Sequence, residues 1–201
     1  MTTHDWKKFL PRAEAFHGHL CSGQILGVRL ALKGLELLNL EPGGNHRDLV
    51  LFLETDRCMA DAAIVVTGVT AGRRRLKFRD YGKAAISFLD LATGQAFRVA
   101  AASEPRPPHG LTDLVGFWSA YADEQIMTAE EVAIEVPPED RPGKPLRRVT
   151  CEICGEDVMD FRDVEKEGRI MCRACSGTAY YRKLDAAPLG PARSDEAPGA
   201  A

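Results

Sequence analysis

Four cysteines in the C-terminal part constrain the fold of this chain more than any other feature. They form two Cys-x2-Cys pairs with 17 residues between the pairs, at Cys151, Cys154, Cys172 and Cys175. Two intervening residues let both sulfurs of a pair reach one ion, and two such pairs at the ends of a short hairpin complete a tetrahedral Zn²⁺ site. We therefore predict a structural zinc ribbon over residues 149–181, in preference to an iron–sulfur cluster or a redox pair.

Composition divides the rest of the chain. Residues 137–148 hold four prolines and little that can be buried, which is typical of a linker. Residues 182–201 are rich in alanine, proline and glycine, so we expect a disordered tail. Residues 1–136 remain as the main domain, which is long enough to bury a core of its own.

The main domain mixes helical and strand patterns. Apolar residues recur at spacings of three and four between Cys21 and Leu38, which predicts an amphipathic helix. The remaining expected elements are a buried strand over 48–54, a helix over 58–67 capped by Thr55 or Asp56, strands over 74–78, 84–91 and 95–101, and a long helix over 111–127. Hairpin strands that follow one crossover indicate an α+β fold with a mixed or antiparallel sheet.

Small residues form a second stripe on the first predicted helix, at Gly23, Gly27, Ala31 and Gly34. Glycine lowers helix propensity by about 1 kcal/mol relative to alanine, so three glycines in one helix require a reason. The stripe indicates close approach of another element of the same chain or, alternatively, a dimer interface.

Nitrogen and sulfur donors gather before that helix. His17, His19 and Cys21 alternate along the sequence, so they share one face if the segment is extended. Gly18 permits a tight turn if it is not. This cluster suits either a transition-metal ion or a thiolate nucleophile with a histidine as its base.

A second thiol lies at the start of the other predicted helix. Cys58 and Asp61 are three residues apart and therefore on one helix face. Free amides in the first turn of a helix favour a thiolate, so we expect lowered pKa values for Cys21 and Cys58. His17, His19, Cys21, Cys58 and Asp61 together are the candidate second metal or thiolate site.

Charge and hydropathy exclude other classes of protein. The chain has 26 basic and 29 acidic residues and a net charge of −3, which makes nucleic acid an unlikely partner. No apolar run approaches the roughly 18 residues of a membrane span, and the N-terminal residues lack the pattern of a signal peptide. We expect a cytoplasmic protein without a membrane partner.

Several motifs together resemble the E-subunit family of formylmethanofuran dehydrogenase, the FmdE-like proteins. The matching segments are residues 16–23 (FHGHLCSG), 24–27, 54–62 (ETDRCMADA), 67–72, 81–84 and 154–156. The resemblance extends from about residue 15 to residue 178. It implies an α+β domain followed by a zinc ribbon, commonly as a homodimer, in a subunit or accessory protein of molybdenum- or tungsten-pterin enzymes.

The resemblance leads to an expected function. We expect a metal-binding accessory protein or subunit of a molybdenum or tungsten oxidoreductase system, non-catalytic in itself, with structural Zn²⁺ in the ribbon and a second transition metal at the histidine–cysteine site. One alternative is a thiol-dependent enzyme in sulfur or redox transfer that uses Cys21 or Cys58. Another is a zinc-ribbon interaction or regulatory protein whose main domain is a scaffold.

Overall fold

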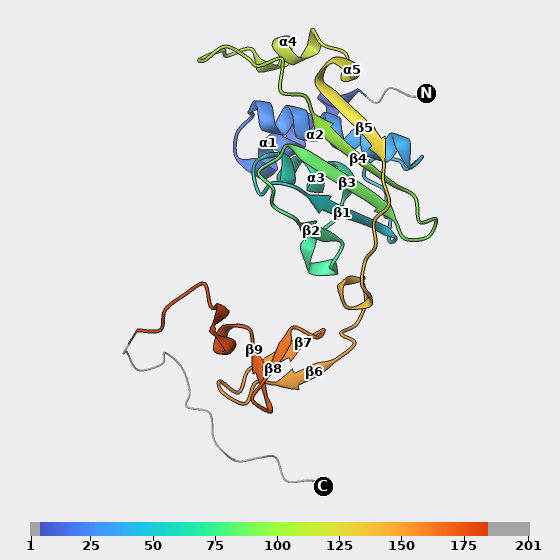
Figure 1. Ribbon diagram of the computed structural model, residues 1–201. Coiled ribbons are helices and arrows are strands. Elements are labelled where there is room, and N and C mark those ends of the chain that lie inside the picture. The colour runs from blue at the N-terminus through green and yellow to red at the C-terminus, as the bar shows by residue number, and fades with distance from the viewer. Residues whose placement is uncertain (1–4, 185–201) are drawn as a thin grey trace. The chain divides into compact units, whose positions relative to one another are not determined.

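The computed structural model describes residues 5–184 and divides the chain into two compact units, with the boundary between Lys144 and Pro145 (Figure 1). This boundary falls within the segment 137–148 that was expected to be a linker. From residue 185 onward, the expected tail lies outside the described residues. None of the helices in residues 5–184 combines the length and the apolar character that crossing a membrane requires.

Within residues 5–144, the first unit contains five α-helices and one five-stranded sheet. Its helices are α1 (Leu10–His17), α2 (Ser22–Leu37), α3 (Met59–Thr67), α4 (Leu114–Ser119) and α5 (Asp123–Ile126). Its strands are β1 (Leu49–Leu53), β2 (Leu76–Phe78), β3 (Ala85–Asp90), β4 (Ala96–Ala101) and β5 (Met127–Glu131). The expected helix over 21–38 and the strands over 48–54, 84–91 and 95–101 correspond to α2, β1, β3 and β4.

The sheet has the strand order β2-β1-β3-β4-β5. Strands β1 and β2 are parallel and are connected through α3, whereas the pairs β1–β3, β3–β4 and β4–β5 are antiparallel. Strands β2 and β3 follow each other in sequence but do not pair, because β1 lies between them. One parallel crossover in an otherwise antiparallel sheet confirms the expected α+β class with a mixed sheet.

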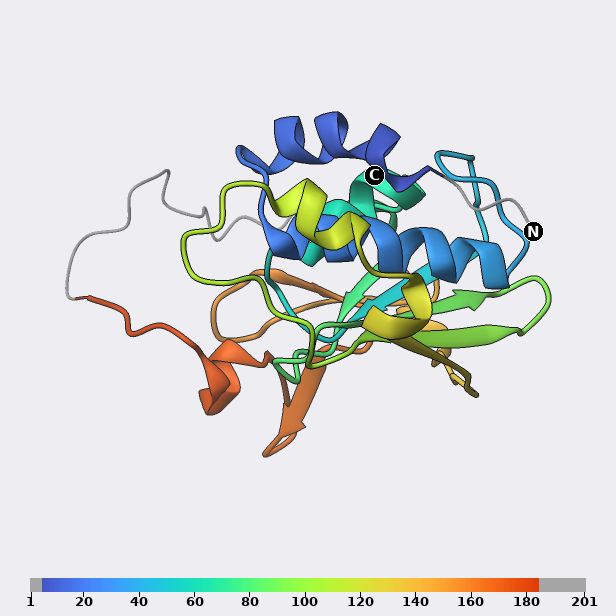
Figure 2. The same ribbon diagram turned by 90° about the horizontal axis from the view of Figure 1, so that it is seen from above.

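The core lies between α2 and one face of the sheet. Helix α2 packs on β3 and β4, and α3 packs along α2 (Figures 1 and 2). Leu51 on β1 and Phe88 on β3 are register partners, and both side chains are fully buried beneath the helices. The alternating strand residues form a smaller apolar cluster on the other face, around Val50, Leu89 and Val136.

The glycines of α2 are explained by contacts within the chain. A Cβ atom at Gly27 would lie 2.7 Å from the Cβ of Ala62 in α3, and one at Gly34 would lie 2.2 Å from the Phe88 ring. These distances are shorter than side-chain packing allows, so only glycine lets α2 lie this close to α3 and β3. Close approach within the chain therefore accounts for the stripe.

The predicted long helix over 111–127 is wrong. The chain forms two short helices, α4 and α5, and then continues as the unpredicted edge strand β5. Buried Arg29 of α2 explains the break: its guanidinium donates to the carbonyl oxygens of Trp118 and Tyr121 and pairs with Asp123. The guanidinium thus satisfies carbonyl oxygens that the end of α4 leaves without helical amide partners, and so stabilises the break.

The second unit is built, over residues 145–184, around two β-hairpins. Strands β6 (Arg148–Thr150) and β7 (Asp157–Met159) pair antiparallel, as do β8 (Asp163–Lys166) and β9 (Arg169–Cys172). Glu167 and Gly168 both have positive φ in the turn between β8 and β9, where the sequence predicts a turn. The Cys-x2-Cys pairs lie at the ends of β6 and β9, as a ribbon-type metal site requires.

Candidate metal centres

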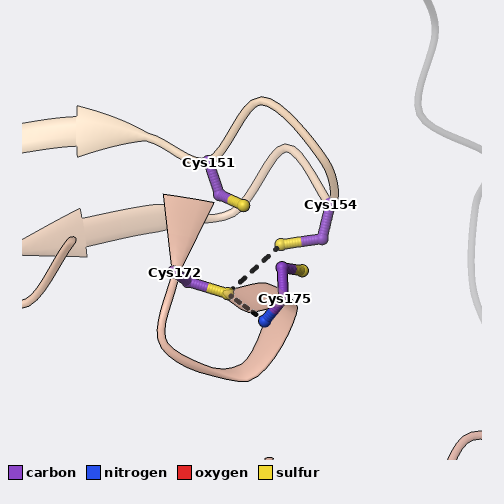
Figure 3. A group of neighbouring side chains, drawn as sticks. All are labelled: Cys151, Cys154, Cys172 and Cys175. Atoms are coloured by element: carbon purple, nitrogen blue, oxygen red, sulfur yellow. Dashed lines mark hydrogen bonds between the residues drawn. The ribbon is translucent and has the colours of Figure 1, made fainter. Parts of the chain in front are cut away.

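The four cysteine sulfurs of the second unit converge on one point (Figure 3). All four lie within 4.8 Å of one another, and the sulfurs of Cys154 and Cys172 are 4.0 Å apart. The edge of a Zn–S₄ tetrahedron with bonds of about 2.3 Å measures about 3.8 Å. The cluster therefore has the dimensions that one metal ion needs.

Backbone amides around this cluster point at sulfur. The amide of Cys175 donates to Cys172 Sγ at 3.4 Å. Hydrogen bonds from the backbone of Cys154 and Cys172 lower the pKa of the Cys151 thiol to about 6, although burial opposes the shift. A thiolate is the form of cysteine that binds metal, so the local backbone prepares Cys151 for an ion.

In the first unit, the donor residues lie at the ends of three helices. His17 is the last residue of α1, Cys21 is the N-cap of α2 and Cys58 is the N-cap of α3. Gly18 has φ +95° and ends α1, so the segment from His17 to Cys21 turns sharply and is not extended. The tight turn that Gly18 permits thus accounts for this cluster.

The turn brings three donors together. One ligand atom each from His17, His19 and Cys21 lies within 4.8 Å of the others. The rings of His17 and His19 are 4.7 Å apart between centroids. His17 and Cys21 are partly buried, whereas His19 is exposed. The arrangement is a three-donor set with one side open to solvent.

His17 is oriented by Asp61. The Nδ1 atom of His17 lies 2.8 Å from a carboxylate oxygen of Asp61, in α3. A carboxylate only accepts, so Nδ1 carries the hydrogen and Nε2 presents its lone pair. This Nε2 is buried and has no hydrogen-bond partner among residues 5–184. Metal-bound histidines typically have a carboxylate on the other ring nitrogen, so this geometry fits a metal ligand supported by Asp61.

Cys58 lies beside Cys21 because Gly23 lets α3 approach α2. A Cβ atom at Gly23 would lie 3.6 Å from Cys58 Sγ and 3.7 Å from Cys21 Sγ. The two sulfurs are therefore less than about 8 Å apart, the limit beyond which local adjustment could not bring both to one ion, although two Zn–S bonds of about 2.3 Å span at most about 4.6 Å. Cys58 is therefore a neighbour of Cys21, but it is not among the three residues whose ligand atoms lie within 4.8 Å of one another.

The thiol of Cys58 is not activated by its helix. Burial, a hydrogen bond with Cys21 and the nearby charges raise the pKa of Cys58, against our expectation of a lowered value. Neither Thr55 nor Asp56 caps α3; Cys58 occupies the N-cap position, and no side chain caps the first turn. Burial, the neighbouring thiol of Cys21 and the carboxylate of Asp61 together disfavour the Cys58 thiolate more than the backbone favours it.

Gln24 is a buried residue that the sequence reasoning missed. Its Nε2 donates to the carbonyl oxygen of Cys58, and its Oε1 has no partner in the described part of the chain. The side chain is completely buried and links α2 to the start of α3. One signal was present in the sequence, since Gln24 lies three residues after Cys21 on the buried face of the predicted helix.

Glu54 and Arg98 form a second polar contact close to the loop that leads to Cys58. Arg98 of β4 donates through Nε and Nη2 to the two carboxylate oxygens of Glu54, at 2.6 and 2.9 Å. The hydrogen bond with Arg98 lowers the pKa of Glu54, although burial opposes the shift. This bidentate pair ties the end of β1 to β4.

Comparison with known proteins places the chain in a family. A curated relative from Archaeoglobus fulgidus, described as a probable S-adenosyl-L-methionine-binding protein, is 27% identical over 86% of this chain. The chain spans about half of that relative's length (54%). The crystal structure of a tungsten formylmethanofuran dehydrogenase FmdE-like protein from Syntrophus aciditrophicus has the same fold, with a TM-score of 0.59 at 21% identity over 90% of this chain and 96% of that one. The family model "FmdE, Molybdenum formylmethanofuran dehydrogenase operon" matches residues 16–133, which is more than half of the sequence, and the chain therefore belongs to the FmdE family.

Proposed function

We propose that this chain is a metal-binding accessory protein or subunit of a formylmethanofuran dehydrogenase-type molybdenum or tungsten system. Its first unit binds a transition-metal ion through His17, His19 and Cys21, with Cys58 as the fourth donor. Its second unit holds a structural Zn²⁺ ion on Cys151, Cys154, Cys172 and Cys175. Family membership supports the association with the dehydrogenase system.

The main support for the first metal site is the hydrogen bonding of His17: Asp61 holds Nδ1, and the buried Nε2 has no partner among the described residues. A buried imidazole nitrogen without a hydrogen-bond partner costs free energy unless another group satisfies it. The other ring nitrogen is held by Asp61, and the neighbouring functional groups are further metal-ligating side chains. Imidazole and thiolate donors together favour Zn²⁺, Ni²⁺ or Fe²⁺ over Mg²⁺ or Ca²⁺.

The thiol-enzyme alternative has less support. A thiolate nucleophile needs a lowered pKa or an adjacent base, yet the pKa of Cys58 is raised. The orientation of His17 does not separate the two functions, because a ring whose Nδ1–H is held by Asp61 presents at Nε2 a lone pair that suits a proton acceptor as well as a metal ligand. Metal binding uses both thiols without requiring either to be ionised beforehand, because the ion itself displaces the protons.

Metal counting tests the proposal. The full chain is stripped with chelator, reloaded with Co²⁺, and its metal content and thiolate-to-Co²⁺ absorption are measured. We expect two ions per chain in the wild type and one in Cys21→Ser or His17→Ala, with the ribbon absorption unchanged. His109→Ala, which changes an exposed histidine outside both clusters, is the matched control and should retain two ions. A wild type that binds only one ion contradicts the proposed first site.

The accessory role has its own experiment. A molybdenum- or tungsten-containing dehydrogenase from the same organism is co-expressed with the wild type or with Cys21→Ser. We expect the dehydrogenase to co-purify with the wild-type chain, and its metal content or activity to fall when the variant replaces it. Equal metal content and activity with both forms, without co-purification, would contradict the accessory role while leaving the metal site intact.

The proposed assembly is a homodimer of twice the chain mass of 22.0 kDa. The glycine stripe of α2 no longer supports it, because α3 and β3 of the same chain fill that stripe. The resemblance to the family carries this expectation alone. Light scattering at micromolar concentration tests it, and a monomer would contradict it.

A further inference from the structure

A cleft of about 450 Å³ begins one residue from the first donor cluster. Ser22, which follows Cys21, lines it together with Leu26 of α2 and Trp118 of α4. Its floor consists of small side chains, with alanines at positions 84, 85, 100, 101 and 102. The cleft exists because these positions carry no more than a methyl group, and its volume is within the range of small-molecule sites.

The lining of the cleft carries positive charge only. Among the described residues, Lys83, Arg98 and Arg106 line it and no carboxylate does. Arg98 is neutralised by Glu54, its bidentate partner, and also meets the exposed carboxylate of Glu130 at 3.3 Å. Lys83 is exposed, and its charge is near enough to the carboxylate of Glu54 to contribute to the lowered pKa of that group. Arg106 meets the exposed carboxylate of Glu104 at 3.6 Å, and such an exposed pair contributes little.

The start of α2 adds to this positive field. Cys21 makes no side-chain cap, and the first intrahelical hydrogen bond of α2 comes from the amide of Ile25. Ser22 Oγ accepts from the indole of Trp118 instead of capping the helix. The free amides of the first turn carry the positive end of the helix dipole at the end of the cleft.

We propose that this cleft binds a small organic anion, with its acidic group near Lys83 and Arg106 and its compact apolar body over the alanine floor and Trp118. The cations favour a carboxylate, sulfonate or similar group, and the apolar floor excludes a strongly hydrated inorganic ion. This site uses none of the metal donors and therefore does not depend on the first metal site. If both sites are occupied, the bound anion lies next to the ion held by Cys21.

Trp118 provides the signal for the experiment. The chain has two tryptophans, Trp6 and Trp118, so Trp6→Phe leaves Trp118 as the only tryptophan energy donor. The probe is 8-anilinonaphthalene-1-sulfonate, and the matched probe is N-phenyl-1-naphthylamine, which has the same ring system without the sulfonate. Both dyes are titrated against the full, zinc-loaded chain while energy transfer from Trp118 is recorded.

We expect the sulfonate dye to accept energy from Trp118 and to bind at least about tenfold more tightly than the neutral dye. Lys83→Gln should weaken the sulfonate dye at least about fivefold and leave the neutral dye unchanged, whereas Lys8→Gln, at an exposed lysine outside the cleft, should change neither. Ala102→Leu fills the cleft at an exposed position and should weaken both dyes. Equal binding of the two dyes, or no response to Lys83→Gln, overturns the proposal.

Cys21→Ser separates this proposal from the metal site. If the sulfonate dye binds this variant as it binds the wild type, the anion site stands whether or not the first metal site exists. If the variant retains its metal content but loses the dye, the cleft is not an independent site and the proposal fails in this form.

Discussion

The donor clusters in the two units of this protein are built in opposite ways. In the ribbon, each Cys-x2-Cys pair lies within one local turn, and the backbone of that turn donates to sulfur. In the first unit, the donors come from the ends of three helices, and His17 and Asp61 are 44 positions apart. The pKa of Cys151 is lowered, whereas burial and hydrogen bonds with neighbouring thiols raise the pKa values of Cys154 and Cys175 in the ribbon and of Cys58 in the first unit. The local turns of the ribbon thus favour one thiolate, that of Cys151, through backbone amides, whereas the cluster of the first unit depends on the packing of its helices.

The largest expected effect breaks the ribbon. Cys172→Ser should remove its metal and make residues 145–184 sensitive to protease, because apparent Zn²⁺ binding energies of about 10–16 kcal/mol supply most of the stability of so small a unit. Limited proteolysis with mass spectrometry should show cleavage in the second unit and an intact fragment covering residues 5–144. Full metal content in the variant would contradict the four-thiolate assignment.

The next-largest expected effect tests whether Asp61 orients His17 in the first unit and does not itself bind the metal. Asp61→Ala should weaken metal binding by about 10- to 100-fold, because His17 loses the acceptor that fixes its tautomer. Asp61→Asn keeps an acceptor and should lose less. Asp56→Ala changes an exposed carboxylate two residues before Cys58 and serves as the control. Competition with a chromogenic chelator measures all four proteins, and equal losses for positions 56 and 61 would contradict the positioning role.

A steric change tests whether helix packing holds the two thiols together. A Cβ atom at Gly23 would lie 2.9 Å from Cys58 Cβ, so Gly23→Ala should push α3 away from α2. We expect a loss of about 1–2 kcal/mol in the free energy of unfolding, after the gain in helix propensity, together with weaker metal binding. Gly72→Ala is the matched control, because its Cβ would meet nothing within 4 Å.

Urea denaturation of both glycine variants gives the comparison. Unchanged stability and metal binding in Gly23→Ala would show that α2 and α3 have room for a methyl group at this position, and would contradict the close contact. A similar loss in Gly72→Ala would point to a general effect of added methyl groups instead.

The smallest expected effect concerns the ion pair between Glu54 and Arg98, which joins the end of β1 to β4. The pKa of Glu54 is lowered in the folded state, so its contribution is complete above the unfolded pKa of about 4.5 and is lost as pH falls through the lower folded value. At pH 7, Glu54→Gln should cost about 1 kcal/mol, and the difference from wild type should shrink below about pH 4. Urea denaturation over this range of pH measures it, and a difference independent of pH would exclude an ionised Glu54 as its source.

The sequence predictions were accurate for features that depend on neighbouring residues and less accurate for features that depend on residues remote in the sequence. The convergence of the ribbon cysteines was predictable because pairs three residues apart need only local geometry, and α2 was predictable from its apolar spacing. The break in 111–127 was not, because it depends on Arg29, which is remote in sequence and takes the carbonyls of Trp118 and Tyr121. Helix α1 and strand β5 were missed, since their short segments carry weak periodicity.

The candidate site was predictable as a set of residues but not as a set of roles. The sequence indicates that His17, His19 and Cys21 can lie close together. Only the folded chain shows that Asp61 accepts a hydrogen bond from His17 and is not a further donor of the three-residue set. The role of Gln24 in joining α2 to α3 depends on its hydrogen bond to the backbone carbonyl oxygen of Cys58. Every residue has such an oxygen, so no sequence pattern reveals this contact.

The exposure of His19 has a consequence for how quickly the two candidate sites would exchange a bound ion. An ion in the first unit has an exposed ligand, so an incoming chelator can displace His19 first and remove the ion stepwise while the helices stay packed. In the ribbon, Cys151 is fully buried and Cys154, Cys172 and Cys175 are partly buried, so none of the four ligands is exposed as His19 is. If both clusters hold an ion, we therefore expect the ion with the exposed histidine ligand to exchange faster than the ion of the ribbon.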